Sequence, residues 1–485
     1  MKLGQLIDAL AEREVSGPTD VDIRSIAYDS RKVTPGALFV AIRGEHTDGH
    51  RYISSALAKG AVAVVVDRGH SEPAQTTIRV DNSRKALALL SAQWYGRPAE
   101  KLRLVGITGT DGKTTTSFLL RSVLQSAGYR TGLIGTVITS SGEEAVPSLY
   151  TTPESLELQE ILAHMSLEGN EYVVMEVSSH ALALDRVFGI PFEMGIFTNL
   201  SRDHLDFHGD FQHYRDVKAL LFERLRGQDS CAVINLDDPN AQFIRDKTKV
   251  PVVTFSVEME ADVFLLNANL TMEMTEIEAS TPQGPIHFQL HLLGRYNVSN
   301  ALASVAAGIA LELPVADIRD GLKQVRGVDG RFEVVETGRG FSVIVDYAHT
   351  PQALSRLLGA VRDMSSGSLL VIFGCGGDRD RGKRPQMGLM ASRLADKVIL
   401  TTDNPRSEDP LEILREVEGG VVPGARYEVV VDRRQAIRRG LTLAQPGDVL
   451  VVAGRGHERF QIVGDQQIPF LDRAIILEEL EKLNP

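Results

Sequence analysis

Short apolar runs alternate with amphipathic segments along most of the chain. In its middle part, the apolar runs predict strands at 102–108, 172–177, 194–198, 231–237 and 252–256. Nearly continuous apolar runs of this kind are typical of a parallel sheet that helices cover on both faces. Residues 264–293 depart from this rhythm and predict an antiparallel ribbon, and residues 295–311 predict a long alanine-rich helix.

The same alternation extends toward both ends. Before the middle part, strands are predicted at 37–42 and 61–67 and a helix at 83–95, with a linker at 96–100. After it, alternating with helices, strands are predicted at 341–345, 369–373, 397–401, 426–431 and 448–452. A prior of about 150 residues per domain favours three domains. We place them at 1–100, 101–328 and 329–485, the last with a second open α/β sheet.

Composition narrows the class of protein. Of the 485 residues, 43% are hydrophobic and 24% charged, as in ordinary soluble globular proteins. The formal net charge of −12 disfavours a nucleic-acid binder. No apolar run approaches the roughly 20 residues of a membrane span, and the N-terminus does not resemble a signal peptide. Cys231 and Cys375 give no disulfide framework, so we interpret both as structural and expect a cytoplasmic protein. We also expect a monomer.

The segment GITGTDGKTTT at 106–116 carries the strongest chemical signal. It lies between a predicted strand and a helix predicted at 117–126, so its backbone N–H groups and a helix N-terminus face one point, which is typical of a phosphate site. Lys113 then reaches the β/γ-phosphates and the Thr114 hydroxyl faces Mg²⁺. Ile107 stands where the usual pattern has glycine, so Gly109 is the first loop glycine, which disfavours an ordinary GTPase or kinase. A ligand-free turn is the structural alternative.

Three more side chains follow apolar elements. Glu176 ends a predicted strand, where sites of parallel sheets open, and is suited to hold Mg²⁺; the alternative is a solvent-exposed acid. His204, in a loop rich in metal-ligating side chains, could bind a second metal ion, although alone it would indicate a surface loop. Lys218 lies in a helix predicted at 213–222, and taken alone it would be a solvated lysine.

In combination these segments resemble the Mur ligases of peptidoglycan synthesis, and the resemblance extends over essentially the whole chain. Besides the loop, the matching motifs are DSR (29–31), LFVA (38–41), TTP (151–153), MEVSSHAL (175–182), FTNLSRDHLDFHG (197–209), HYRDVKALLF (213–222), LGRYNVSN (293–300), VDYAHTP (345–351), GCGGDRD (374–380), KRP (383–385), DNPR (403–406) and GRGHE (454–458).

The resemblance implies an α/β enzyme with three domains: a central P-loop-type ATPase domain with a parallel sheet, a small N-terminal α/β domain and a C-terminal Rossmann-like domain. They would hold ATP, a uridine nucleotide and an amino acid, respectively. ATP would phosphorylate the D-glutamate carboxylate of UDP-N-acetylmuramoyl-L-alanyl-D-glutamate. The amine of the incoming amino acid would attack the acyl phosphate, and a tetrahedral intermediate would expel phosphate. Phosphoryl transfer of this kind depends on positioning and on Mg²⁺.

The resemblance also implies roles for particular residues. Lys113, Glu176, His204 and Lys218 are the catalytic candidates, with Thr114, Glu176, His204 and a carbamylated Lys218 as metal ligands. A bare ammonium would repel Mg²⁺, whereas a carbamate is an anionic oxygen ligand. The implied ATP contacts are Gly109, Thr110, Asp111, Gly112, Lys113, Thr114, Thr115, Asn297, Asp346 and His349. Asp111 replaces the more usual asparagine, and whether it caps the turn or approaches the phosphates is open.

Positions that match uridine-substrate contacts are Tyr28, Ser30, Thr151, Thr152, Ser178 and Arg186. Arg186 suits a diphosphate or a carboxylate. Leu184 replaces a contacting glutamine of some relatives, and residues 45–47 lie at contact positions of variable type.

Positions that match the amino-acid site are Arg379, Asp403, Asn404, Pro405, Arg406, Gly454 and Glu458. The DNPR motif resembles that of members that add meso-diaminopimelate. Arg406 can hold the distal carboxylate of that substrate in a bidentate pair, Glu458 its ammonium, and Arg379 the other carboxylate. L-lysine lacks the distal carboxylate and would leave Arg406 unpaired. Addition of L-lysine stays an alternative, because some lysine-adding relatives keep an arginine here.

Other function classes are less consistent with the motifs. A folylpolyglutamate synthetase-like ligase would lack the N-terminal uridine-nucleotide domain and the DNPR motif. A P-loop NTPase that acts as a switch would need neither DNPR nor GRGHE. An inactive homologue is disfavoured by the intact Lys113, Glu176, His204 and Lys218.

Overall fold

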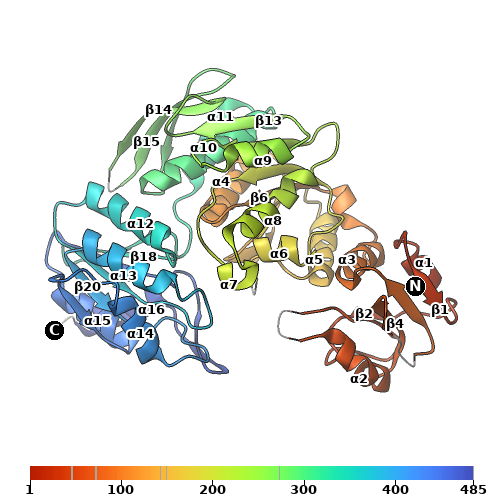
Figure 1. Ribbon diagram of the computed structural model, residues 1–485. Helices are drawn as coiled ribbons and strands as arrows, with labels where there is room; N and C mark the ends of the chain where they lie inside the picture. The colour runs from red at the N-terminus through yellow and green to blue at the C-terminus, as the bar shows by residue number, and fades with distance from the viewer. Residues whose placement is uncertain (45–46, 71–73, 143, 149, 272, 484–485) are drawn as a thin grey trace.

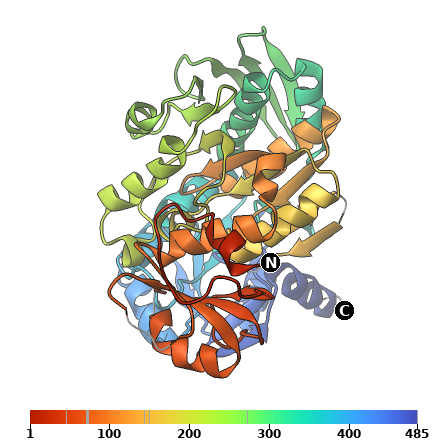
Figure 2. The same cartoon turned by 90° about the vertical axis from the view of Figure 1, so that its right-hand side faces the viewer.

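The computed structural model describes residues 1–44, 47–70, 74–142, 144–148, 150–271 and 273–483. Figure 1 shows three lobes, with the central lobe between the N-terminal and C-terminal lobes. In Figure 2 both terminal lobes lie on the same side of the central lobe. Each lobe has its own main sheet, so the predicted three-part α/β fold is confirmed. Of the residues predicted to contact the uridine substrate, Glu45 and His46 lie outside the described ranges.

The N-terminal lobe has a sheet in the order β1-β5-β4-β3-β2, parallel except for β1. Two apolar clusters cover its two faces, so the strands β3, β4 and β5 are buried on both faces of the sheet. Its elements are α1 (Leu3–Ile7), β1 (Glu14–Ser16), β2 (Ser25–Ala27), β3 (Ala37–Val40), η1 (Gly49–Tyr52), α2 (Ile53–Ala58), β4 (Ala61–Asp67), β5 (Thr77–Val80) and α3 (Ser83–Trp94).

The central lobe has a sheet in the order β16-β15-β14-β13-β12-β11-β6-β10-β7-β8-β9. Its elements are η2 (Pro98–Lys101), β6 (Arg103–Thr108), α4 (Lys113–Ser126), β7 (Thr131–Ile134), β8 (Ile138–Ser141), β9 (Glu144–Pro147), α5 (Ser155–Leu167), β10 (Tyr172–Glu176), α6 (Ser179–Ala183), β11 (Phe192–Phe197), α7 (Leu205–His208), α8 (Phe211–Glu223), β12 (Cys231–Asn235), α9 (Ala241–Lys247), β13 (Val252–Ser256), β14 (Val263–Leu270), β15 (Thr275–Ser280), β16 (Ile286–Leu290), α10 (Arg295–Ala310) and α11 (Val315–Gln324).

Strand β10 shows why the apolar runs are continuous. Tyr172 and Val174 belong to the core under α4, α10 and α11, whereas Val173 and Met175 belong to the core under α5, α6 and α8. Because successive side chains of a strand point to opposite faces, a sheet covered on both faces needs apolar residues at every position. The antiparallel ribbon predicted within 264–293 is confirmed as β14 to β16.

The C-terminal lobe has a sheet in the order β17-β18-β22-β19-β20-β21, parallel except for β17, with an additional hairpin of β23 and β24. Its elements are β17 (Glu333–Glu336), β18 (Ser342–Asp346), α12 (Pro351–Met364), β19 (Leu369–Phe373), α13 (Lys383–Leu394), β20 (Lys397–Leu400), α14 (Pro410–Glu418), β21 (Tyr427–Val429), α15 (Arg433–Leu443), β22 (Val449–Ala453), β23 (Phe460–Val463), β24 (Gln466–Pro469) and α16 (Asp472–Lys482).

The observed bounds of a helix differ from the predicted ones where glycine and polar residues interrupt the periodicity of apolar residues. Helix α4 begins at Lys113, four residues before the predicted start at 117, because the threonine-rich first turn still packs inward at Thr114 to Thr116. Cys231 and Cys375 are both free and buried, as expected of structural cysteines. Within the described ranges, no helix combines the length and apolarity needed to cross a membrane.

Candidate functional site

The glycine-rich loop lies at the carboxyl end of β6, between β11 and β10. This is where the chain order reverses across a parallel sheet, the usual place for a ligand in such folds. Gly109 and Gly112 have φ values of +151° and +85°, which favour glycine. A Cβ at Gly112 would lie 2.3 Å from Oδ1 of Asn300, so α10 packs directly against the loop.

Lys113 folds back over its own loop. Its Nζ donates to the carbonyl oxygens of Gly109 (2.9 Å) and Thr110 (2.8 Å). Burial lowers the pKa of this ammonium from its ordinary value. The lysine that is predicted to reach phosphates therefore lies at the loop and contacts its backbone oxygens.

Glu176 is fully buried and accepts three hydrogen bonds, so it is not a solvent-exposed acid. Thr114 Oγ1 donates to its Oε2 (3.1 Å), and the Thr136 N–H and hydroxyl donate to Oε1 (2.7 Å) and Oε2 (2.9 Å). A hydroxyl and a carboxylate thus converge beside the loop, an oxygen donor set that fits Mg²⁺. Thr136 was not found from the sequence, because no motif marks it.

Lys218 is 1% exposed and is therefore not a solvated lysine. Its Nζ donates to the same Gly109 carbonyl oxygen (2.7 Å). Burial, and then the charge of Lys113, lower its pKa well below the ordinary value. Within the described ranges no carboxylate forms an ion pair with it. The Lys218 amine is thus buried at the loop in surroundings that disfavour its charged form.

His204 lies opposite this lysine in the same cavity and has a left-handed backbone, with φ +53°. Burial lowers its pKa to about 3, so the imidazole is neutral and can act as a ligand. Its Nε2 lies 3.4 Å from the carboxylate of Asp203, which also lies 3.7 Å from Nε2 of His349 in the C-terminal lobe.

These groups line a cavity of about 670 Å³ between the central and C-terminal lobes, here called the interlobe cavity. From the C-terminal side it is lined by Asp346 and His349, among others. Asp346 accepts the backbone N–H groups of Phe332 and Ala348 (both 2.7 Å), and burial raises its pKa. Asn297 does not line the cavity; its amide donates to Leu293 and its oxygen accepts from Asn300, so it supports the loop indirectly.

Two arginines from beyond the central lobe complete the interlobe cavity. Nη1 of Arg356, on α12, lies 3.4 Å from the Asp111 carboxylate. The Asp111 side chain therefore turns toward the C-terminal lobe and does not cap the loop. Arg331 donates to the Thr114 hydroxyl (3.1 Å) and lies over the Tyr347 ring. Neither arginine was found from the sequence, although the glycine cluster ending at Gly330 marks the change of lobe just before Arg331.

The residues predicted to contact the uridine substrate are divided between segments. Thr151 and Ser178 line the interlobe cavity, and the Thr152 hydroxyl ties them to β10 through the Glu176 carbonyl (2.8 Å). Arg186 donates to the Thr152 carbonyl (3.2 Å) and lies 3.4 Å from a Glu154 carboxylate oxygen.

Tyr28 and Ser30 line neither the interlobe cavity nor a second one of about 620 Å³ between the N-terminal and central lobes. The second cavity is lined by Arg43, Arg84 and Leu184, among others. Sequence reasoning missed both arginines because no motif contains them.

The residues predicted to bind the amino acid gather at the carboxyl ends of β19, β20 and β22. Arg406 Nη1 donates to the Gly377 carbonyl (2.7 Å), and Arg379 donates to its neighbour Asp378 (2.9 Å). A Cβ at Gly376 would lie 2.8 Å from Nη1 of Arg406 and 3.8 Å from Cγ of Arg379, so the two side chains lie near each other. Burial, and then the charge of Arg379, lower the pKa of Arg406. Within the described ranges neither forms an ion pair with a carboxylate.

Two carboxylates lie in the same group. The Asn404 amide donates to Glu458 (2.7 Å), and burial followed by the charge of Asp403 raises the pKa of Glu458. Gly454 packs closely here, since a Cβ would lie 2.8 Å from Asp403 Oδ2. Pro405 continues the loop, and its carbonyl accepts from the Glu408 N–H. Arg406, Asp403 and Glu458 therefore lie in one region, where Glu458 is also 3.6 Å from Nη1 of Arg455.

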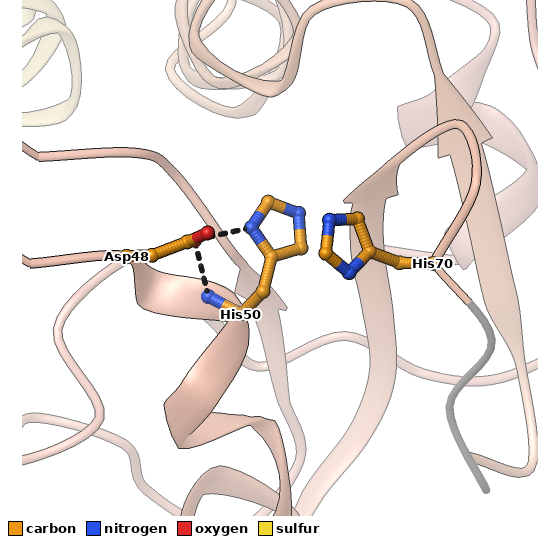
Figure 3. A group of neighbouring side chains, drawn as sticks. All are labelled: Asp48, His50 and His70. Atoms are coloured by element: carbon orange, nitrogen blue, oxygen red, sulfur yellow. Dashed lines mark hydrogen bonds and ion pairs between the residues drawn. The ribbon is translucent and has the colours of Figure 1, made fainter.

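A separate group in the N-terminal lobe contains Asp48, His50 and His70 (Figure 3). Both ring nitrogens of His50 are engaged: Nδ1 lies 2.6 Å from Asp48, and Nε2 accepts the Asp67 N–H (3.1 Å). His70 stacks on the His50 ring at 4.0 Å. Because His50 has no nitrogen left to coordinate an ion, this group holds a turn of the N-terminal sheet together.

Known proteins match the chain in all three lobes. Residues 22–95 match the Mur ligase family catalytic domain, 107–308 the Mur ligase middle domain and 330–456 the Mur ligase glutamate ligase domain. A curated relative, the UDP-N-acetylmuramoyl-L-alanyl-D-glutamate–2,6-diaminopimelate ligase of Geobacillus thermodenitrificans, is 44% identical over 481 residues, which cover 98% of both chains.

Solved structures are similar to the chain over the same three lobes. The structure of a UDP-N-acetylmuramoyl-L-alanyl-D-glutamate–2,6-diaminopimelate ligase has a TM-score of 0.68 and 30% identity, and each chain is covered in full. Folylpolyglutamate synthase of Mycobacterium tuberculosis, complexed with ADP and AMPPCP, covers 76% of this chain and 92% of its own, at 18% identity and a TM-score of 0.64, and shares the fold alone.

The chain belongs to the Mur ligase family. The resemblance predicted from the motifs is confirmed, and so is the prediction that the chain is an ATP-dependent ligase.

Proposed function

We propose that this enzyme adds meso-diaminopimelate to UDP-N-acetylmuramoyl-L-alanyl-D-glutamate in peptidoglycan precursor synthesis. The relatives matched over the full chain carry this activity in their names. The observation that carries the proposal is the pair of guanidiniums, Arg379 and Arg406, neither of which forms an ion pair with a carboxylate of the described residues, with the charges of Asp403 and Glu458 acting on Arg406.

The chemistry of meso-diaminopimelate fits such a group. Its two carboxylates would pair with Arg379 and Arg406, and its distal ammonium with Glu458. L-lysine has one carboxylate fewer and would leave a half-buried guanidinium unpaired. A site built for a polar group discriminates strongly against an analogue that lacks it.

Phosphoryl transfer is proposed at the glycine-rich loop. Bound Mg²⁺ would neutralise charge that develops on the transferred phosphoryl group. Thr114, Glu176, His204 and Lys218 as a carbamate would hold metal ions, and Lys113 would contact the β/γ-phosphates. The carbamate is supported by the burial of Lys218 beside Lys113, because burial disfavours the bare ammonium and an anionic group there would pair with the Lys113 ammonium and with a bound metal ion.

The uridine nucleotide is proposed to bind between the N-terminal and central lobes, close to Arg186 and Arg84. A folylpolyglutamate synthase-like activity is disfavoured because the synthase matches only 76% of this chain. That the enzyme is a monomer stays a prediction.

The test is ATP-dependent phosphate release with the uridine dipeptide precursor and Mg²⁺, with either meso-diaminopimelate or L-lysine, followed by the mass of the product. We expect turnover with meso-diaminopimelate, and a preference over lysine of about 100-fold or more in kcat/KM. Arg406→Lys should raise KM for meso-diaminopimelate at least tenfold, because an ammonium cannot form the bidentate pair.

Arg393→Lys is the matched control, since Arg393 is exposed on α13 and is assigned no part in the site. Preferential turnover of lysine by the wild-type enzyme would overturn the substrate assignment and leave the ligase assignment intact.

A further inference from the structure

Two loops of the C-terminal lobe carry the guanidiniums of the proposed amino-acid site. Arg379 lies in the loop after β19, and Arg406 lies in the loop after the neighbouring strand β20. Asp378 and Arg406 have left-handed backbones, with φ of +53° and +52°. Residues other than glycine hold such conformations only where surrounding contacts fix them. The separation of the two guanidiniums therefore depends on what joins the loops.

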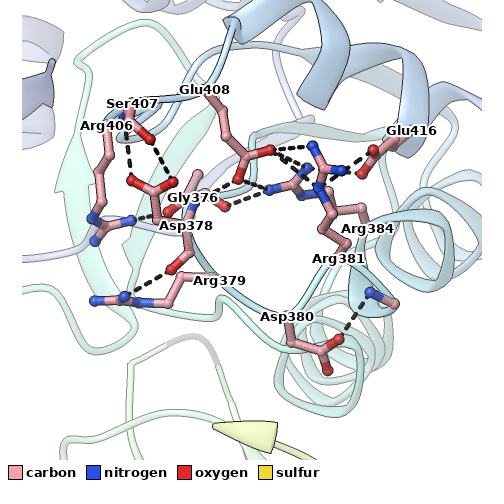
Figure 4. A network of polar contacts seen from close by, with 12 residues as sticks. Gly376, Asp378, Arg379, Asp380, Arg381, Arg384, Arg406, Ser407, Glu408 and Glu416 are labelled. Atoms are coloured by element: carbon pink, nitrogen blue, oxygen red, sulfur yellow. Dashed lines mark hydrogen bonds and ion pairs between the residues drawn. The ribbon is translucent and has the colours of Figure 1, made fainter. Parts of the chain in front are cut away.

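Glu408 joins them directly (Figure 4). Its Oε1 accepts the backbone N–H of Asp378 (2.6 Å) and Nη2 of Arg384 (2.8 Å). Its Oε2 accepts Nη1 of Arg384 (3.0 Å) and Nη2 of Arg381 (2.7 Å). A single carboxylate on the second loop thus holds the backbone of the first loop, its Arg381, and Arg384 of the helix that follows it.

Arg384, at the start of α13, anchors this carboxylate. The side chain is 0% exposed, and it also donates to Glu416 of α14 (2.8 Å) and to the Gly376 carbonyl (3.3 Å). A fully buried guanidinium needs such partners, because an unpaired buried charge is costly. The side-chain hydrogen bonds from Arg384 help to lower the pKa of Glu408 to about 2, so the carboxylate is charged at neutral pH.

A second connection lies beside the first. The Asp378 carboxylate accepts the Ser407 hydroxyl (2.7 Å) and backbone N–H (3.2 Å). The Arg406 guanidinium donates to Gly377 of the first loop, and a Cβ at Gly376 would lie 2.8 Å from its Nη1. Hydrogen bonds to the opposite loop therefore hold Asp378, which precedes Arg379, and Ser407, which follows Arg406.

We propose that Glu408, anchored by Arg384, is a positioning residue for substrate selectivity: it fixes the separation of Arg379 and Arg406 so that both meet the carboxylates of meso-diaminopimelate. The inference rests on the proposed function and adds to it the groups that set its selectivity. Glu408 itself contacts neither substrate nor phosphate; it acts through the two loops.

The first test is Glu408→Gln. The Glu408 carboxylate accepts five hydrogen bonds through its two oxygens. An amide can accept through one oxygen only, so the bonds to the other oxygen are lost while side-chain size is kept. We expect KM for meso-diaminopimelate to rise about tenfold or more, with kcat at saturation and KM for ATP changing less than about threefold. The preference for meso-diaminopimelate over L-lysine should fall by a similar factor.

Glu428→Gln is the matched control. Glu428 also accepts from two cations, Arg439 and Lys397, which lower its pKa to about 2, but it lies on the edge strand β21 away from both loops. This variant should keep the wild-type KM values and selectivity.

Asp378→Asn is the second variant, chosen in case Glu408→Gln does not fold. Asparagine tolerates the left-handed backbone, but its one oxygen can accept only one of the two Ser407 donors. The same selective rise in KM for meso-diaminopimelate is expected, with Ser407→Ala giving a smaller rise.

The results separate the two proposals. If the wild-type enzyme does not use meso-diaminopimelate, the proposed function fails. If it does, and the folded Glu408 and Asp378 variants lose thermal stability with unchanged KM and selectivity, the network is only structural and the positioning role is overturned.

Discussion

Lys218 shows how strongly one residue's surroundings can differ from its sequence context. It lies in an amphipathic helix, yet it is buried beside Gly109 and Lys113 with no carboxylate partner in the described ranges. Burial of an ammonium is costly, so these surroundings favour a neutral amine, or a modified side chain as proposed above, over a charged lysine.

At this scale we predict the effect of Lys218→Ala. Ligation should fall by about 100-fold or more, because the variant loses the anionic oxygen ligand of the proposed carbamate. Small carboxylates such as formate or acetate in the buffer should restore part of the activity. Phosphate release with and without the carboxylate is the measurement.

Lys323→Ala, at an exposed position of α11, is the control and should behave as the wild type. Full activity of Lys218→Ala without any added carboxylate would exclude the carbamate role.

Among the elements, the turn from β6 to α4 is the most sensitive to side-chain size, because other segments approach its backbone closely. A Cβ at Gly109 would lie 1.9 Å from Oγ1 of Thr198, in the loop after β11. The loop can therefore keep its shape only with glycine at this position.

We predict that Gly109→Ala destabilises the protein by about 1–3 kcal/mol and abolishes measurable ATP binding, since the carbonyl that accepts from Lys113 and Lys218 must move. Urea denaturation and calorimetric titration with ATP and Mg²⁺ would measure both effects.

Gly128→Ala provides the comparison. Gly128 also has a positive φ (+90°), but a Cβ there would meet nothing within 4 Å. This variant should lose about 1 kcal/mol of stability and bind ATP normally. Equal loss of ATP binding in both variants would mean that backbone strain, and not the approach of Thr198, is responsible.

For the whole molecule, the sites depend on contacts between lobes. Tyr28 donates to Glu157 (2.8 Å), and Arg84 pairs with Glu154 (3.1 Å), so polar contacts join the N-terminal and central lobes. Asp111–Arg356 and Arg202–Asp380 join the central and C-terminal lobes. A ligand bound between lobes should therefore stabilise the whole chain.

We predict that the uridine dipeptide precursor raises the melting temperature by several degrees, since a ligand at 100 times its Kd adds about 2.7 kcal/mol. Arg186→Ala should reduce this shift by removing a cation proposed to contact the substrate. Arg245→Ala, exposed on α9, should keep it. No shift in the wild type at millimolar precursor would contradict the uridine site.

Local patterns were enough to predict the framework. The turn that carries Lys113 and Thr114, and the strand that ends at Glu176, were predicted because such elements are encoded by consecutive residues. The predicted antiparallel ribbon and the long helix after it were also visible as changes of period. Contacts between distant segments left no such trace: Arg356 lies 245 positions from Asp111, and Arg331 lies 217 positions from Thr114.

The sequence by itself determined the α/β class, the family, the glycine-rich loop after the first strand of the central sheet, and the chemical types at the proposed amino-acid site, because each is written in short contiguous motifs. Only the tertiary structure decided that Lys218 is buried, that Asp111 turns toward Arg356, and that Glu408 ties together the loops of Arg379 and Arg406. Burial and charge pairing depend on which segments pack together, and packing is a property of the whole fold.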